Sequence, residues 1–281
     1  MLLDDASVYS IRITPDKLAK IIDHTNLRPY TTKQDIKKLC SEAKRYQFGA
    51  ICVNPHYVLL CKEFLRDSEV EIAAVIGFPL GSTTSETKAF ETRSVIEAGA
   101  TEIDMVMNIG AFRNGDFEFV QEDIYNVVKA ADGAIVKVIL ETGYLTDVQI
   151  AKACKIAKAA EANFVKTSTG FGPMGAYYDH VKLMRETVGE KFGVKAAGGI
   201  RTAKAAVRMV NAGANRIGTS TGVKIIEDLK KTIANGKWFD EKDDKPEEIF
   251  SWGAANSSKQ PKEIYEYYIK KRERFYKNSG G

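Results

Sequence analysis

Short apolar runs rich in Val and Ile alternate along the chain with longer stretches in which apolar residues recur at helical spacing. Short apolar runs between turn signals are typical of buried strands, and the longer amphipathic stretches indicate helices. The pattern predicts strands at residues 21–24, 50–53, 72–76, 102–107, 135–140, 163–167, 193–196 and 215–218. It predicts helices at residues 32–47, 56–66, 83–98, 116–131, 146–160, 177–188, 202–211 and 222–234.

Regular alternation of strand and helix favours parallel pairing through right-handed crossovers. Eight such units fit a closed (β/α)₈ TIM barrel, and the absence of an opening GxGxxG motif weakens the alternative of a Rossmann sheet. Similar joints precede alternate strands at residues 48–50, 98–100, 161–163 and 212–214. We expect Gly or Asn in these joints to adopt the left-handed conformation that ends a helix.

The two ends of the chain lie outside the eight units. A short helix is predicted before the first strand, with Thr14 as its cap and Pro15 in its first turn. We assign residues 1–235 to the barrel domain and residues 236–281 to a C-terminal extension that is partly helical, near 262–277, and not an independent domain.

Composition changes this picture little, but it excludes several classes of protein. The net charge of the 281 residues is only +4 and the charges are interspersed, so we expect neither nucleic acid nor a membrane as a partner. The first ten residues carry acids where a signal peptide would be basic, and the four cysteines form no CxxC pair, so we expect a cytoplasmic protein. The chain has only three histidines, so we predict no metal site.

Three lysines interrupt otherwise apolar strands: Lys137, Lys166 and Lys195. Lysine is depleted in strands and is rarely buried without a partner. One such lysine is most simply explained by a stem that reaches water, but three in successive strands of a buried sheet indicate chemistry. Lys166 and Lys195 lie about one βα unit apart, so they belong to neighbouring strands.

A lysine that is neutral near pH 7 attacks carbonyl groups and forms Schiff bases. Burial and a neighbouring positive charge both favour the neutral amine, so one of the two lysines can be the nucleophile and the other the activating charge. Asp23 and Asp104 also interrupt predicted strands. They can serve as ion-pair partners of the lysines or in proton transfer, and these roles are compatible.

The last three strands end in glycines and hydroxyl groups, at residues 167–170, 197–200 and 217–222. Glycines let the backbone approach a ligand, helix N-termini bind anions, and loops after strands 7 and 8 of barrels often hold phosphate. Each segment alone could be a turn with a helix cap. Together, beside two strand lysines, they favour a phosphorylated substrate.

At this point the sequence resembles the deoxyribose-phosphate aldolase family. The resemblance runs from Asp23 to Lys230 and includes the segments IDHTNL (22–27), AICVNP (50–55), the strand of Asp104, VKVILETG (136–143), VKTSTG (165–170) and VKAAGGIR (194–201). No single segment decides the match, but their order and spacing make chance an inadequate explanation.

The resemblance implies reversible cleavage of 2-deoxy-D-ribose 5-phosphate to acetaldehyde and D-glyceraldehyde 3-phosphate, without cofactor, in a homo-oligomer (dimer or tetramer). It implies that Lys166 forms the Schiff base, that Lys195 perturbs its pKa and that Asp104 relays protons with water. It assigns substrate binding to Lys137 and Thr167, with lesser roles for Asp23 and Cys52. It assigns the phosphate to Gly170, Gly198, Gly199, Ser220 and Thr221.

Two features depart from the family pattern. Some relatives carry a lysine directly after TSTG, whereas Phe171 stands here, and the segment after Trp238 has no counterpart in the pattern. Two other functions stay open from the sequence: another phosphosugar barrel, either an aldolase with a different donor or a metal-dependent epimerase, and a barrel that binds a phosphorylated metabolite without catalysis.

Overall fold

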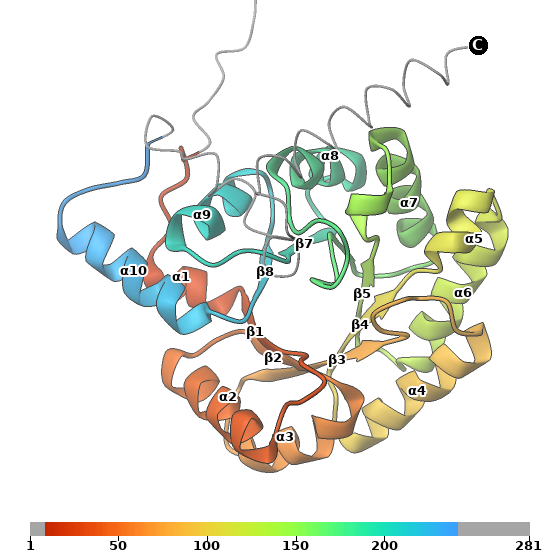
Figure 1. Cartoon of the computed structure of the whole chain (residues 1–281), viewed down its shortest axis with the longest axis horizontal. Helices are drawn as coiled ribbons and strands as arrows, with labels where there is room; N and C mark the ends of the chain where they lie inside the picture. Colours follow the sequence, from red (N-terminus) through yellow and green to blue (C-terminus); the bar gives the residue numbers. More distant parts are fainter. Residues whose placement is uncertain (1–8, 241–281) are drawn as a thin grey trace, which may run out of the picture.

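Eight parallel strands close into a barrel with helices on its outside (Figure 1). The computed structural model describes residues 9–240. The strands are β1 (Ile22–Asn26), β2 (Ala50–Val53), β3 (Glu71–Ile76), β4 (Glu102–Val106), β5 (Ile135–Ile139), β6 (Phe164–Lys166), β7 (Gly193–Ala197) and β8 (Arg216–Thr219). Each strand pairs with the next in chain order and β8 pairs with β1, which confirms the predicted TIM barrel.

Helices follow the strands in the predicted alternation. They are α1 (Pro15–Lys20), α2 (Lys33–Tyr46), α3 (Val58–Phe64), α4 (Ser85–Ala98), α5 (Ile109–Asn114), α6 (Phe117–Ala130), α7 (Asp147–Ala159), α8 (Tyr178–Val188), α9 (Ala203–Asn211) and α10 (Gly222–Ala234), with the 3₁₀ turns η1 (Pro55–Tyr57) and η2 (Thr142–Tyr144). The sequence pattern missed α5 and η2. Both are short and interrupted by glycine, so tertiary packing rather than helical periodicity defines them.

The helix ends confirm part of the local prediction. Thr14 caps α1 as expected, its hydroxyl accepting the backbone N–H of Lys17. Gly99 and Gly213 adopt left-handed backbone with φ of 111° and 103°. The prediction was wrong for the other two joints, where Gln47 and Glu161 take the left-handed conformation instead.

Gly49 has a different role from the one predicted. A Cβ atom at this position would lie 2.2 Å from the backbone oxygen of Lys20, so glycine allows β2 to start close against the end of α1. Asn163 also acts through its side chain, which accepts the backbone N–H of Val136 at 2.7 Å and joins the starts of β5 and β6.

The main apolar core lies between the strands and the surrounding helices. A second, small cluster of Leu27, Cys52, Ala73 and Val75, with Phe78 against it, includes side chains of β2 and β3 that do not join that main core.

After α10 the chain returns to the N-terminal segment, where the Trp238 indole donates to the backbone oxygen of Tyr9 at 2.9 Å. The helix predicted near 262–277 lies outside the described residues.

Candidate active site

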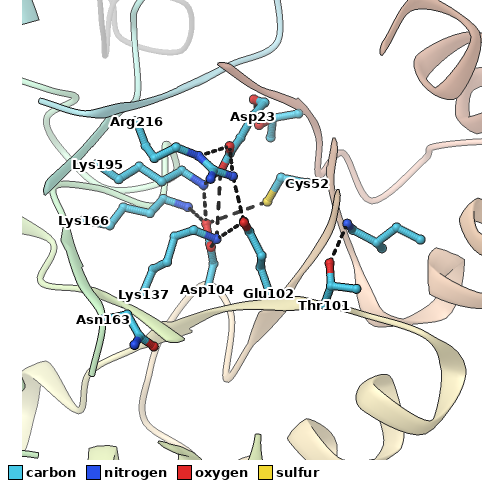
Figure 2. A network of polar contacts seen from close by, with 12 residues as sticks. Asp23, Cys52, Thr101, Glu102, Asp104, Lys137, Asn163, Lys166, Lys195 and Arg216 are labelled. Carbon is cyan, nitrogen blue, oxygen red and sulfur yellow. Dashed lines mark hydrogen bonds and ion pairs between the residues drawn. The ribbon is translucent and has the colours of Figure 1, made fainter. Parts of the chain in front are cut away.

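Seven charged side chains from six strands meet inside the barrel (Figure 2). They are Asp23 of β1, Glu102 and Asp104 of β4, Lys137 of β5, Lys166 of β6, Lys195 of β7 and Arg216 of β8. The strand register brings them into adjacent rows, because Asp104 pairs with Lys137, Lys166 with Lys195, and Lys195 with Arg216. The lysines and aspartates that interrupt the predicted strands therefore lie together inside the barrel.

Asp104 lies at the centre of this charged cluster. Its Oδ2 accepts from Lys166 Nζ at 2.6 Å and from Lys195 Nζ at 2.7 Å, while its Oδ1 accepts from Lys137 Nζ at 2.9 Å. Burial alone would raise the pKa of Asp104, but Lys137, Lys166 and Lys195 outweigh it and hold this pKa well below its usual range. One carboxylate is thus shared by three lysines.

Lys195 is fully buried and bridges two carboxylates, since its ammonium group also donates to Asp23. Burial opposes the charge, but Asp104 and Asp23 outweigh it and raise the pKa of Lys195 above its ordinary value. The pKa of Asp23 is lowered to about 2, because Lys195 and Arg216 overcome the opposing effect of burial. Gly218 leaves room for this lysine, since a Cβ there would lie 3.2 Å from Lys195 Cε.

Glu102 and Arg216 complete the cluster, and the sequence analysis missed both. Glu102 Oε2 accepts from Lys137 Nζ at 2.5 Å and from Arg216 at 2.8 Å. Arg216 also donates to Asp23 Oδ1 at 2.8 Å. A charged residue at the first position of a strand is ordinary and attracts no notice in the sequence. The one sequence signal for Glu102 is its two-residue spacing from Asp104, which puts both side chains on the same face of β4.

A cavity of about 410 Å³ lies at the carboxyl ends of the strands and reaches the charged cluster at one residue. Lys166 lines it, whereas Lys137 and Lys195 do not appear among its described lining residues. Of the three strand lysines, Lys166 is thus the one placed to meet a ligand. Lys137 and Asp23 are fully buried behind it, bound to other members of the cluster.

Thr167 and Cys52 are also buried, and neither lines this cavity as described. The Thr167 hydroxyl donates to the backbone oxygen of Ala197 and accepts the N–H of the same residue, so it ties β6 to β7. The Cys52 thiol lies 3.9 Å from Asp104 Oδ2. Burial, with Asp104 nearby, raises the pKa of Cys52 to about 11, and the thiol stays protonated near neutral pH.

Four of the five residues predicted to bind phosphate line the cavity: Gly170, Gly198, Gly199 and Ser220. Gly198 and Gly199 have φ of 92° and 78°, a conformation that L side chains rarely adopt. Thr221 lies at the start of α10, with its hydroxyl 3.1 Å from that of Thr219. The cations Arg28, Lys38 and Arg201 lie along the same cavity, accompanied by Asp35 and Glu42.

The balance of charges in the cluster bears on reactivity. Lys137, Lys166, Lys195 and Arg216 supply four cationic groups, whereas Asp23, Glu102 and Asp104 supply three carboxylates. A neutral Lys166 would leave three charges of each sign.

Among the described residues, no group of three His, Cys, Asp or Glu side chains is arranged to hold a metal ion. In the same part of the chain, no helix is both long and apolar enough to cross a membrane.

Comparisons with known proteins identify the family of the chain. A deoxyribose-phosphate aldolase of Thermococcus gammatolerans is 59% identical over 214 residues, covering 75% of this chain and 95% of that protein. One of Clostridium tetani is 54% identical over 215 residues, covering 76% and 100%. A solved deoxyribose phosphate aldolase of Aeropyrum pernix, described as having a unique tetrameric structure, superposes with a TM-score of 0.73 at 38% identity, covering 77% of this chain and 92% of that one. The model of the DeoC/LacD family aldolases matches residues 17–228, and the chain belongs to this family.

Proposed function

We propose that this protein is a lyase that reversibly cleaves 2-deoxy-D-ribose 5-phosphate into acetaldehyde and D-glyceraldehyde 3-phosphate through a Schiff base on Lys166. The observation that carries the assignment is the placement of the three buried lysines. All three contact Asp104, but Lys166 is the one that lines the cavity. Relatives with 59% and 54% sequence identity to this chain are named for this activity.

Lys166 is the nucleophile of the proposed reaction. Its Nζ adds to the C1 aldehyde of the open-chain sugar, and uptake of one proton with loss of water leaves a protonated imine. Lys195, whose pKa is raised by Asp104 and Asp23, shares Asp104 Oδ2 with Lys166, and a neighbouring positive charge favours the neutral form of an amine. Lys195 therefore acts as the activating charge, as the sequence analysis suggested.

Carbon–carbon cleavage then uses the imine as an electron sink. The C2–C3 bond breaks, its electron pair forms an enamine at C1 and C2, and the proton of the C3 hydroxyl leaves as that carbon becomes the aldehyde of glyceraldehyde 3-phosphate. Protonation of the enamine at C2 and hydrolysis release acetaldehyde and restore the amine. Asp104, hydrogen-bonded to Lys166 at 2.6 Å, moves these protons together with water.

We assign the phosphate to the part of the cavity that Gly198, Gly199 and Ser220 line. Gly198 and Gly199 allow close approach to the backbone, and Ser220 stands two residues before the start of α10, where free N–H groups favour an anion. Arg201 and Arg28 line the cavity and supply positive charge for the phosphate. They can do so although Phe171 stands directly after TSTG, where some relatives carry a lysine.

A homo-oligomer, dimer or tetramer, is part of the proposal. The solved relative from Aeropyrum pernix is described as tetrameric. On this protomer Leu80 and Phe90, which line a second cavity beside α4, are 72% and 67% exposed. Light scattering of the purified protein should give a multiple of the chain mass, and a monomer at micromolar concentration would contradict this part.

The proposed reaction is tested by product analysis. The purified protein should release acetaldehyde and glyceraldehyde 3-phosphate from 2-deoxyribose 5-phosphate, and form the sugar phosphate from the two products. Turnover of another phosphorylated donor but not this one would indicate an aldolase of different specificity. Stabilisation by the sugar phosphate without any turnover would indicate a binding protein instead.

A further inference from the structure

Glu141 lies just beyond the carboxyl end of β5, in the short link to η2, and has no part in the reaction described above. It is one of the described non-glycine residues with left-handed backbone, with φ of 52° and ψ of 62°. The residue is only 2% exposed. Strained backbone and a buried carboxyl group are both unfavourable, so the surrounding contacts must hold this residue in place.

The carboxyl group organises the segment that follows β6. Its Oε2 accepts the backbone N–H of Thr169 at 3.2 Å and also the Thr169 hydroxyl. That hydroxyl in turn accepts the backbone N–H of Phe171 at 3.0 Å. One carboxyl oxygen therefore fixes both sides of Gly170, whose φ of 87° belongs to the same turn.

Further contacts show how closely this turn is built around the carboxyl group. A Cβ atom on Gly172 would lie 2.6 Å from Glu141 Cδ, so glycine is required to make room for it. Glu141 Oε1 has no hydrogen-bond partner among the described residues. Burial raises the pKa of Glu141, although the Thr169 bonds and the nearby Lys166 oppose that rise.

The organised segment forms one wall of the cavity. Thr169, Gly170 and Phe171 line it together with Lys166, Gly198 and Gly199. The Phe171 ring also packs edge-on against Phe78 of the β3–α4 loop, with centroids 5.4 Å apart. Residues 169–171 lie beyond the carboxyl end of β6 and share the cavity with Gly198 and Gly199, the residues to which the proposed function assigns the phosphate.

We propose that Glu141 is a positioning residue that shapes the Thr169–Phe171 wall for the phosphate-bearing end of the substrate. The inference rests on the proposed function. Loss of the carboxyl group should loosen the turn, weaken binding of the phosphorylated end and leave Schiff-base formation at Lys166 intact.

The test compares a substrate with and without its phosphate. Glu141→Ala should raise KM for 2-deoxyribose 5-phosphate about tenfold or more, the loss expected when a charge-assisted contact network is broken. kcat/KM for 2-deoxyribose should stay within about threefold, because this sugar lacks the group that the wall binds. Glu141→Gln keeps an acceptor oxygen and should restore most of the affinity.

Two further variants reach the same contact from the other side. Gly172→Ala should displace the carboxyl group and raise the same KM, and Thr169→Val should do so by removing the bridging hydroxyl. Because all three act through one contact, the effects of Glu141→Ala and Thr169→Val should not add in the double variant. Glu161→Ala is the matched control, because it removes another glutamate with left-handed backbone, before β6. It should change neither KM for 2-deoxyribose 5-phosphate nor kcat/KM for 2-deoxyribose.

The outcomes separate the two proposals. A wild-type protein that does not cleave the sugar phosphate would contradict the proposed function. An active wild type whose Glu141, Gly172 and Thr169 variants lose activity equally on both sugars, or keep KM unchanged while melting normally, would overturn the positioning role. Reduced trapping of acetaldehyde on Lys166 in Glu141→Ala would overturn it as well.

Discussion

The inside of the barrel has two unlike halves. On β2 and β3 it carries Cys52, Ala73 and Val75, which are small, apolar and packed in one cluster with Leu27. From β4 round to β1 it carries seven charged groups in contact with one another (Figure 2). The register joins the halves directly, because Val75 pairs with Asp104.

This comparison shows that closing the barrel does not require the charges. Side chains such as Ala73 and Val75 fill the interior at equivalent positions without the desolvation cost that buried ions carry. Breaking a buried ion pair is strongly destabilising, but replacing the whole pair by apolar groups is often neutral or stabilising. The charged half is therefore best explained by chemistry, and its reactive member should be distinguishable from its supporting members.

The largest effect is expected for Lys166→Ala. Without its nucleophile the protein should lose cleavage activity by at least about 10⁴-fold. The fold should persist, since Asp104 keeps Lys137 and Lys195 as partners. Steady-state kinetics and a melting curve measure the two quantities.

An ion pair of a buried lysine between two outer helices serves as the control for this variant. Lys88 of α4 is fully buried and binds Asp123 of α6 at 2.5 Å. Lys88→Met should lower the free energy of unfolding by about 3–5 kcal/mol, because it leaves a buried carboxylate unpaired. The folded variant should keep kcat, and a loss of kcat as large as that of Lys166→Ala would mean that burial of lysine, not its place, decides activity.

An intermediate effect is expected for Lys195→Met. The carboxylate of Asp104, now shared with Lys195, would be left more fully to Lys166 and would favour its charged form. Formation of the Schiff base should therefore require a higher pH than in the wild type. The pH dependence of borohydride trapping measures this, and an unchanged profile would remove the activating role of Lys195.

The smallest effect is expected in the apolar half. Cys52→Ala removes a thiol whose pKa is raised to about 11 and which is therefore protonated near pH 7. Turnover should stay within about twofold, with a loss of about 1–2 kcal/mol in the free energy of unfolding for the small cavity created. A large loss of turnover at unchanged stability would place this residue among the catalytic groups and erase the distinction between the halves.

Much of the fold could be predicted because buried parallel strands leave a strong signal. Runs such as residues 72–76 are apolar on both faces, and each of the eight predicted strands is present. Left-handed helix ends were harder to place, since Gln47 and Glu161 take a conformation expected of glycine or asparagine. Neither side chain favours that conformation, so no sequence signal marks it.

The site was predictable where a residue contradicts its surroundings. Lys137, Lys166, Lys195, Asp104 and Asp23 are polar within apolar strands, and this alone identified them. Glu102 and Arg216 begin their strands, where charge is ordinary; the spacing to Asp104 is the one sequence signal for Glu102, and Arg216 is recognised as inward-facing only in the closed barrel. Glu141 stood out only as part of a family motif, because its role depends on contacts with a segment 28 residues away.

The central claim is that Lys166 alone among the three buried barrel lysines meets the substrate. Reduction with borohydride in the presence of acetaldehyde, followed by peptide mapping, tests it most directly, since it reports the nucleophile and the type of chemistry together. We predict a single ethyl adduct, on the peptide that contains Lys166, and none in Lys166→Ala. An adduct on Lys137 or Lys195, or no adduct on the folded wild-type protein, would contradict the account.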